Sequence, residues 1–278
     1  MQSHSKLGSI TGVVGVSLIV FLIGVALFGP FFGLANPTTN NLMARLAPPS
    51  FDTAKGLHLF GTDQLGRDIL SRTIHGARVT LMIGATAVIL GGVIGIVIGL
   101  IAGYYGRWVD AVLMRIVDVQ LSIPLSLLAL LVVGSIGPSL QNLILVLALT
   151  SWVQYARVVR GQVLVVRERE YIQSAHAIGL GDLRIIFKHI LPNVISAALV
   201  IASIELARVI ILEAALSFLG LGVQPPAASW GRMLAEGRAY MSTAPWIAIF
   251  PGAAIFLTAL SVNLTGDWLR DLLDPKVN

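Results

Sequence analysis

The chain has 278 residues, of which 56% are hydrophobic and 12% are charged, and its net charge is +5. Soluble globular domains carry about 25% charged residues, so the composition argues against a soluble enzyme or binding module. The small net charge without a basic block argues against binding to nucleic acid. The sequence contains no cysteine, which excludes disulfide bonds and thiolate metal sites.

Long uncharged stretches identify membrane-spanning segments. Residues 7–44, 79–106, 119–156 and 239–266 contain no Asp, Glu, Lys or Arg. A helix needs roughly 20 apolar residues to cross the hydrocarbon core of a bilayer, and each stretch is longer than that. We therefore predict an all-α membrane protein with six transmembrane helices.

The first predicted helix covers residues 10–32. Its apolar run is longer than that of a signal peptide and lacks a small-residue cleavage site, so we expect an uncleaved helix. The chain then divides into an N-terminal tail with this helix (1–35), a polar segment (36–78) and a core domain (79–278). The polar segment contains Pro37, Pro48 and Pro49, which interrupt it too often for a spanning helix.

The second predicted helix, residues 79–104, carries glycines at every fourth position: Gly91, Gly95, Gly99 and Gly103. Residues four apart share one face of a helix. In lipid, small residues let two helix backbones approach closely. We interpret this stripe as a buried packing face, with a flexible gating face as the alternative.

The remaining predicted helices cover residues 111–133, with Pro124 inside, and residues 139–159, 193–219 and 245–269. An even number of crossings places both termini on the same side. That side would carry eleven Lys and Arg against seven on the other. Lys and Arg are enriched in short cytoplasmic loops, so we predict that both termini and the charged loop at 160–192 are cytoplasmic and that segment 36–78 is extracytoplasmic.

The charged loop is predicted to contain two short helices separated by a glycine bend. Tyr171, Ala175 and Ile178 lie at helical spacing, and Gly179 and Gly181 suit a left-handed helix stop.

We expect Asp182 to cap the second short helix and Pro192 to lie in the first turn of the fifth spanning helix. The helix pair would rest on the membrane surface. By spacing alone, a docking element and an amphipathic connector on the headgroups are equally good interpretations.

Three charges fall within the fifth spanning helix: Glu205, Arg208 and Glu213. Charges inside lipid are costly and usually face a bundle interior or an aqueous path. Glu205 and Arg208 are three residues apart, so they can pair. We predict that these residues line a translocation path, and a structural ion pair is the alternative.

In the outer segment, Asp63, Arg67 and Asp68 are candidate contacts for a substrate-delivery protein. Mutual capping and ion pairs that fold this segment are the favoured alternative. The five histidines show no ligand-like pairing, so no metal site is expected. The chain has no phosphate-binding loop and no nucleophile or zinc-protease motif, so we expect no catalysis and no cofactor in this chain.

Two long strings carry a resemblance to a known family. Both resemble strings of the peptide and nickel permeases of ATP-binding-cassette (ABC) importers. The first string comprises residues 61–68, Ser71-Arg72 and residues 76–78. The second comprises residues 213–222, Pro225-Pro226 and residues 229–231. The charged loop resembles the Glu-Ala-Ala loop of such permeases, with Gln173-Ser174-Ala175 at the triplet, then Gly179 and residues 190–192. Gln and Ser replace the first two residues of the triplet.

This resemblance implies a type I ABC importer permease (MetI-like) fold and a C-type dipeptide permease subunit in the bacterial cytoplasmic membrane. It would translocate dipeptides or short oligopeptides by alternating access. The implied partners are a paralogous permease in a heterodimer, two cytoplasmic ATPase subunits that hold ATP and Mg, and an extracytoplasmic substrate-binding protein. The implied ATPase-coupling residues are Gln173, Ser174, Ala175, Gly179, Leu180, Gly181 and Asp182.

Three alternatives stay open from the sequence. The same kind of permease could carry nickel, glutathione or another small solute. An ATP-independent channel or carrier would not explain the loop with its glycine bend, and no inverted repeat indicates a duplicated carrier. A membrane-bound assembly factor would not explain the charges within the fifth spanning helix.

Overall fold

The computed structural model describes residues 2–32, 34–51 and 58–273, and these ranges contain helices and turns without a β-strand. Residues 1, 33, 52–57 and 274–278, which fall within the predicted segments 1–35, 36–78 and 79–278, lie outside the described residues. Within the described residues, five helices are long and apolar enough to cross a membrane, and there are six if a bent pair of helices counts as one span. The predicted all-α membrane architecture is therefore confirmed, with five or six candidate spans.

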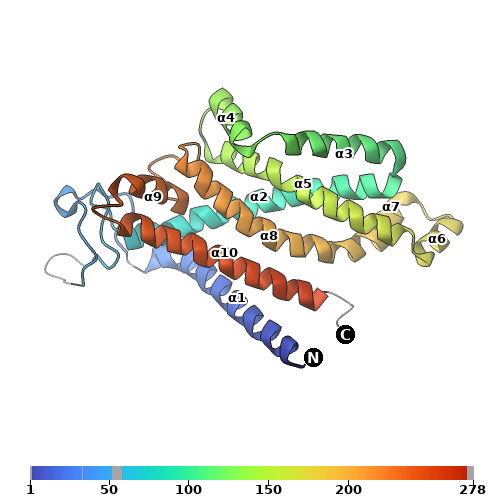
Figure 1. The fold of residues 1–278 in the computed structure, drawn as a ribbon, viewed down its shortest axis with the longest axis horizontal. Helices are drawn as coiled ribbons and strands as arrows, with labels where there is room; N and C mark the ends of the chain where they lie inside the picture. Colours follow the sequence, from blue (N-terminus) through green and yellow to red (C-terminus); the bar gives the residue numbers. More distant parts are fainter. Residues whose placement is uncertain (1, 33, 52–57, 274–278) are drawn as a thin grey trace.

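The spans pack as a layered bundle (Figure 1). Helices α2 (Ile69–Tyr105), α5 (Leu140–Arg167) and α8 (Leu191–Phe218) form the centre. Helices α1 (Gln2–Phe28) and α10 (Trp246–Leu273) pack together on one side. On the other side α3 (Arg107–Ser122) runs alongside α5, and α4 (Leu125–Ile136) projects at a steep angle near the start of α5.

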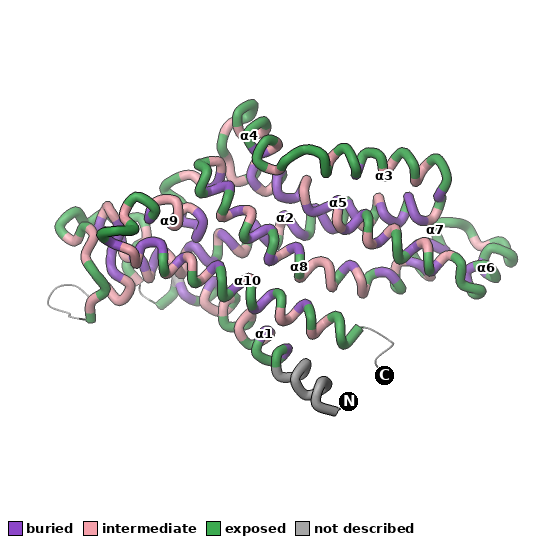
Figure 2. Tube along the Cα trace, viewed as in Figure 1, coloured by how far each residue is buried: buried purple, intermediate pink, exposed green. Residues whose placement is uncertain are grey.

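Burial follows this arrangement (Figure 2). The central helices are buried along their contact faces, whereas α3 and α4 expose most of their residues. Such exposed apolar helices require lipid or another protein around them, because water alone would make them an aggregation hazard.

The glycine stripe of α2 packs against α5 as predicted. A Cβ added at Gly91 would lie 2.8 Å from the Cβ of Ser151, and one at Gly99 would lie 2.7 Å from the carbonyl oxygen of Ala156. Real Cβ atoms do not approach other atoms this closely, so only glycine permits this helix–helix separation.

Helix α2 begins at Ile69 rather than at Val79, so residues 69–78 of the predicted polar segment are helical. The physical reason is an N-cap: the side chain of Asp68 accepts a hydrogen bond from the backbone N–H of Ser71 at 2.8 Å. Helix α1 likewise begins earlier, at Gln2, and a short 3₁₀ turn, η1 (Gly29–Phe31), follows its end.

The prediction of a single helix over residues 111–133, with Pro124 inside it, is wrong. Pro124 separates α3 from α4, and the two are bent by 86°. Proline has no N–H to continue the helix and forces the preceding residue into an extended conformation. Ile123 has that conformation, with φ −91° and ψ 117°.

The second helix of the charged loop is not a separate surface helix, which corrects the prediction. Helix α7 (Asp182–Ile185), the π-helical segment η4 (Ile186–Ile190) and α8 form one continuous run over residues 182–218. Pro192 lies in the first turn of α8, as predicted. Because its nitrogen cannot donate, the register shifts, and Leu191 N–H donates to the carbonyl of Ile186, five residues back.

A shorter helix closes the end of the bundle opposite α6 (Glu170–Ala177), as Figure 1 shows. Helix α9 (Trp230–Gly237) starts after the Ser229 N-cap and is followed by the 3₁₀ turn η5 (Arg238–Tyr240). Trp230 is buried, and its indole Nε1 donates to the carbonyl of Thr73 at 2.8 Å, which holds α9 against α2. Another 3₁₀ turn, η2 (Leu42–Ala44), lies in the outer segment.

Candidate functional site

The charged loop folds into α6, a turn and α7. Gly179 has φ +78°, in the left-handed region. The backbone N–H groups of Gly179 and Leu180 donate to the carbonyls of His176 and Ala175 at 2.9 and 3.1 Å, which is the hydrogen-bond pattern of a Schellman helix end. The predicted helix stop at Gly179 is confirmed, and residues 175–182 are called the α6–α7 turn below.

Two details of the α6–α7 turn differ from the prediction. Gly181 is not left-handed but extended, with φ −68° and ψ 147°, and it occupies the N-cap position expected for Asp182. Asp182 is the first residue of α7, and its side chain accepts a hydrogen bond from Tyr104 Oη at 2.8 Å. Tyr104 lies near the end of α2, and no spacing rule links positions 78 residues apart.

The predicted coupling residues gather on α6 and the turn. Gln173, Ser174, Gly179, Gly181 and Asp182 are exposed, Leu180 is half-buried and Ala175 is buried. The small Ala175 therefore packs inward and lets α6 lie close to the bundle.

Three large apolar side chains project from the same region into solvent. Ile178, Leu183 and Phe187 have exposed fractions of 77%, 69% and 61%. Leu183 and Phe187 are four residues apart, so they share one helix face beside the turn. The sequence indicated an apolar face on this short helix through Leu183, Ile186, Phe187 and Ile190, and the structure shows that Leu183 and Phe187 are its exposed members, whereas Ile186 and Ile190 are buried.

The charges of α8 separate into two groups. Arg208 Nη1 donates to Glu205 Oε1 at 3.2 Å, so the predicted pairing is confirmed. The Glu205 side chain is 5% exposed and that of Arg208 is 43% exposed. The Arg208 side chain is thus partly exposed on the surface of α8, whereas its partner Glu205 is buried. A path-lining role for this pair stays a prediction.

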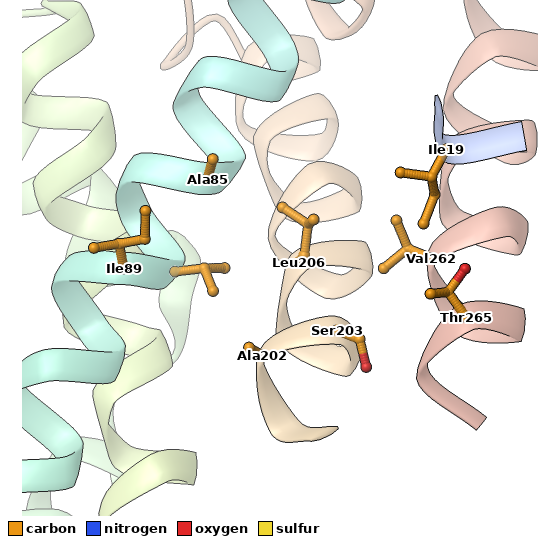
Figure 3. Close-up of a pocket in the computed structure, with 9 residues that line it drawn as sticks. Ile19, Ala85, Ile89, Ala202, Ser203, Leu206, Val262 and Thr265 are labelled. Atoms are coloured by element: carbon orange, nitrogen blue, oxygen red, sulfur yellow. The ribbon is translucent and has the colours of Figure 1, made fainter. Parts of the chain in front are cut away.

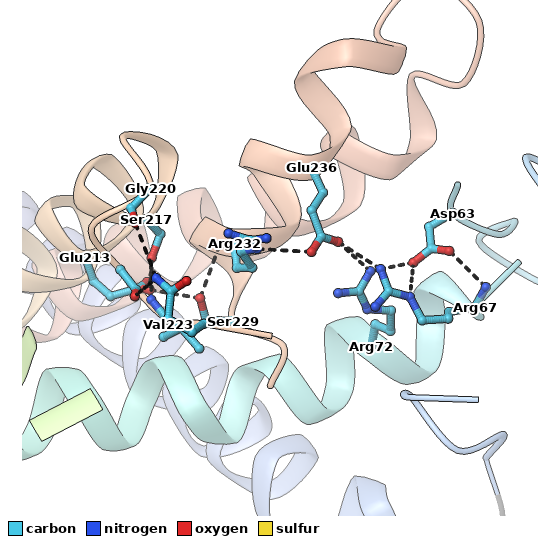
Figure 4. A network of polar contacts seen from close by, with 12 residues as sticks. Asp63, Arg67, Arg72, Glu213, Ser217, Gly220, Val223, Ser229, Arg232 and Glu236 are labelled. Carbon is cyan, nitrogen blue, oxygen red and sulfur yellow. Dashed lines mark hydrogen bonds and ion pairs between the residues drawn. The ribbon is translucent and has the colours of Figure 1, made fainter. Parts of the chain in front are cut away.

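Glu213 belongs to a different network (Figure 4). It is fully buried, and Oε1 accepts hydrogen bonds from the hydroxyls of Ser217 and Ser229 at 2.7 and 2.9 Å. These bonds connect the end of α8 to the N-cap of α9. A path-lining role for Glu213 also stays a prediction.

Five charged residues lie at the end of the bundle that carries α9, called the outer end after its predicted side, and form a group that we call the ion-pair cluster: Asp63, Arg67, Arg72, Arg232 and Glu236 (Figure 4). Asp63, Arg67 and Arg72 are buried, and the other two are partly buried. Asp63 Oδ2 accepts from Arg67 Nε at 2.6 Å and from Arg72 Nη1 at 2.5 Å. Glu236 accepts from Arg67, Arg72 and Arg232 at 3.1, 2.8 and 3.1 Å.

The electrostatics of the ion-pair cluster follow from its geometry. Burial raises the pKa of Glu236, but the charges and hydrogen bonds of Arg72, Arg67 and Arg232 outweigh burial, so the pKa lies below its usual value. Glu236 therefore carries its negative charge at neutral pH and balances the arginines.

The favoured interpretation of Asp63, Arg67 and Asp68 is confirmed. Asp63 and Arg67 pair with each other, whereas Asp68 caps α2 and lies 3.0 Å from Nδ1 of His58. Contact with a substrate-delivery protein stays a prediction for all three. The sequence analysis missed Arg72 and Glu236 as partners.

An apolar groove of about 270 Å³ lies between α1, α2, α8 and α10 (Figure 3). Ile19, Ile89, Leu206 and Val262 are among its lining residues. A groove with this lining has no charged group to recognise an ionic solute. The described residues also contain no cluster of His, Asp and Glu that could hold a metal ion.

The chain matches a known family over most of its length. Residues 95–278 match the model of the binding-protein-dependent transport system inner membrane component. The dipeptide transport system permease protein DppC of Alkalihalophilus pseudofirmus is 43% identical, and the match covers 95% of this chain and 86% of that protein. The probable D,D-dipeptide transport system permease protein DdpC of Escherichia coli is 41% identical, over 97% and 89%.

Two further matches concern cargo names and fold. The glutathione transport system permease protein GsiD of Pectobacterium atrosepticum is 48% identical over 79% of this chain and 73% of that protein. Inward-facing structures of the MetNI methionine ABC transporter contain a chain that aligns with a TM-score of 0.61 at 19% identity, covering 74% of this chain and 98% of that chain. The last match shows the fold. Together with the helical bundle and the α6–α7 turn, these matches confirm the resemblance found in the sequence: the chain belongs to the family of binding-protein-dependent transport system inner membrane components, the permease subunits of ABC importers.

Proposed function

We propose that this chain, as a permease subunit, translocates dipeptides or short oligopeptides across the bacterial cytoplasmic membrane by alternating access. The observation that carries the proposal is the apolar surface of Ile178, Leu183 and Phe187 beside the left-handed turn at Gly179. An exposed apolar patch of this kind on a charged loop marks a contact with another protein.

The partner at this surface is a cytoplasmic ATPase subunit. Because this chain has no phosphate-binding loop, ATP and Mg are held by two such subunits, and this chain performs no covalent chemistry. A helix end with small residues at Gly179 and Gly181 can enter a groove that a bulky side chain would block. Closure of the ATPases then displaces the turn and, with it, α8.

Orientation follows from the same contact. The first residues of α1 and the last residues of α10 lie toward the end of the bundle that carries α6 (Figure 1). If the α6–α7 turn meets a cytoplasmic ATPase, both termini are cytoplasmic, and the ion-pair cluster faces the opposite side. There the outer segment and α9 meet an extracytoplasmic substrate-binding protein.

Peptide cargo is supported by the names of the relatives, most of which are peptide permeases. The path would run between this chain and a paralogous permease in a heterodimer. The exposed guanidinium of Arg208, held by Glu205, offers a cation for a peptide carboxylate. Glutathione, itself a small peptide, is the second candidate because of the 48% identity to a glutathione permease.

Substitution of Gly179 by Trp tests the docking surface. Nothing lies within 4 Å of a Cβ at Gly179, so the indole reaches solvent and blocks the approach of a partner. We expect Gly179→Trp to abolish ATP-driven dipeptide uptake and to reduce co-purification of the ATPase subunits.

The matched control is Gly220→Trp, at the other end of α8. Gly220 is also left-handed, with φ +82°, and a Cβ there also meets nothing within 4 Å, so both variants carry the same backbone strain. If Gly179→Trp shows normal dipeptide uptake and normal co-purification of the ATPase subunits, the proposed function is wrong. Competition by dipeptides, glutathione and Ni²⁺ against labelled dipeptide in the wild type then ranks the cargo.

A further inference from the structure

The α6–α7 turn is joined to the end of α2 by one side chain. Tyr104 Oη donates to Asp182 Oδ1 at 2.8 Å. The Tyr104 ring also stacks on that of His176, with centroids 6.0 Å apart and planes at 23°. His176 belongs to α6 and Asp182 to α7, so this tyrosine contacts both helices that flank the turn.

The end of α2 is in turn fixed to α5. Arg167 Nη1 donates to the carbonyl of Gly103 at 2.8 Å, one residue before Tyr104. A Cβ at Gly103 would lie 2.7 Å from the Cβ of Val163, so the two backbones are in close contact at this level as well. Helices α2 and α5 therefore form a closely packed pair whose end carries Tyr104.

The backbone connection from the turn to α8 is less stiff than a regular α-helix. It passes through the π-helical segment η4, where Leu191 N–H donates five residues back, and then through Pro192, which donates no backbone hydrogen bond. π-helical segments and prolines are the usual sites at which helices bend. A force on the turn can therefore be absorbed in η4 before it reaches α8.

We propose that Tyr104 is a positioning residue that clamps the α6–α7 turn to the α2–α5 pair. Through this clamp, displacement of the turn moves α2 and α5 together with α8. The displacement therefore reaches the bundle even when the helix bends at η4. The inference rests on the proposed function, in which the turn receives the ATPase. Tyr104 itself contacts neither ATP nor cargo.

Replacing Tyr104 by Phe tests the clamp. The variant retains the ring that stacks on His176 and loses the hydroxyl, which donates to Asp182 Oδ1 at 2.8 Å and lies 3.5 Å from Nε2 of His176. ATP hydrolysis and dipeptide uptake are measured in the same proteoliposomes containing the complete transporter. We expect ATP hydrolysis to persist while the amount of peptide transported per ATP falls about three- to tenfold, because water competes for this partly exposed hydrogen bond and limits its worth.

The neighbouring residue provides a matched control. Tyr105 packs edge-on against Tyr104, with ring centroids 5.1 Å apart, and its hydroxyl makes no hydrogen bond within the described part of the chain. Tyr105→Phe removes the same atom from the same helix end, and we expect its transport per ATP to match the wild type.

Variants of Asp182 identify the bond itself. Asp182→Asn retains an oxygen that can accept from Tyr104, so most of the coupling should remain. Asp182→Ala leaves the contact of Tyr104 Oη with His176 in place, so its loss should be no larger than that of Tyr104→Phe. The double variant Tyr104→Phe/Asp182→Ala should lose no more than Tyr104→Phe alone, because that variant already removes the bond to Asp182.

The outcomes separate the clamp from the docking surface. If Tyr104→Phe transports as much peptide per ATP as the wild type, the clamp is overturned. It is also overturned if hydrolysis and uptake fall together in proportion to the amount of folded complex, because Tyr104 then only stabilises the fold. If Gly179→Trp is inactive while Tyr104→Phe is normal, only the clamp fails. If Gly179→Trp is fully active, the proposed function fails first.

Discussion

The two ends of the bundle are built on opposite principles. At the outer end, five charged side chains, three of them buried and two partly buried, connect the segment before α2, the start of α2 and α9 (Figure 4). At the other end, the α6–α7 turn exposes Ile178 and is held to the rest of the chain by the hydrogen bond of Tyr104 to Asp182 and the packing of α6.

This difference indicates which end moves. Buried ion pairs gain little net free energy over apolar packing, but breaking one leaves an unpaired buried charge, so such a cluster permits a single geometry. A turn with exposed side chains, held by the packing of Ala175 and Leu180 and by one hydrogen bond, can shift at a smaller cost than a group of buried ion pairs. We infer that the outer end is a fixed platform and that the turn is the element that responds to a partner.

The largest expected effect is at the centre of the platform. Asp63→Ala leaves Arg67 and Arg72 buried with Glu236 as their remaining carboxylate. Removing one partner of a buried ion pair costs about 3–5 kcal/mol. We expect a clear fall in the unfolding temperature of the purified transporter, measured by thermal denaturation in detergent.

An exposed ion pair provides the control for Asp63→Ala. Asp118 pairs with Arg157 at 2.8 Å, and both side chains are about half exposed. Exposed pairs contribute about 0–1 kcal/mol, so Asp118→Ala should change the unfolding temperature little. Equal effects of Asp63→Ala and Asp118→Ala would show that the ion-pair cluster does not stiffen the outer end.

A smaller effect is expected between the two ends of the bundle, at the contact between α2 and α5. A Cβ at Gly95 would lie 2.5 Å from the Cβ of Tyr155 and would contact the carbonyl oxygen of Trp152 even more closely. Overpacking of this kind costs about 1–3 kcal/mol. We expect Gly95→Ala to lower the unfolding temperature less than Asp63→Ala does.

The matched control for Gly95→Ala is Gly161→Ala on α5. A Cβ at Gly161 meets nothing within 4 Å, and replacing a helical glycine by alanine gains about 0.5–1 kcal/mol. The two alanine substitutions should therefore act in opposite directions. If Gly95→Ala unfolds at the wild-type temperature, α2 and α5 can move apart to admit the methyl group without a loss of stability.

Part of the bundle and part of the turn could be predicted from the sequence, because local rules govern them. The stripe from Gly91 to Gly103, the pairing of Glu205 with Arg208 and the left-handed stop at Gly179 each depend on residues within one or two helical turns.

Other features depend on contacts between distant residues or on a choice between two local rules. Arg72 and Glu236 are 164 positions apart, so nothing in their spacing indicated that they pair. Pro124 breaks a helix with a bend of 86°, whereas Pro192 is accommodated inside a continuous helical run. The sequence shows a proline in each case, and the surrounding packing decides whether the chain bends or continues.

The smallest expected effect is the pH dependence of the platform. The ordinary pKa of 4.5 applies to Glu236 in the unfolded chain, and the arginines hold the pKa of the folded state below it. The unfolded state therefore binds the proton more readily, so the stabilisation is fully present above about pH 4.5 and is lost as the pH falls through the folded-state pKa. This contribution should leave the unfolding temperature level down to about pH 4.5 and lower it as the pH falls further.

Substituting Glu236 by Gln isolates this contribution, because Gln cannot titrate and retains an acceptor for Arg72 and Arg232. We expect the decline of the unfolding temperature with acid to be shallower in Glu236→Gln than in the wild type. Glu168→Gln, at an exposed carboxylate beside Arg167, should leave the decline unchanged. If Glu236→Gln and the wild type lose stability in parallel on acidification, the acid sensitivity arises at other residues. The charge on Glu236 would then not be what makes the outer end more rigid than the α6–α7 turn.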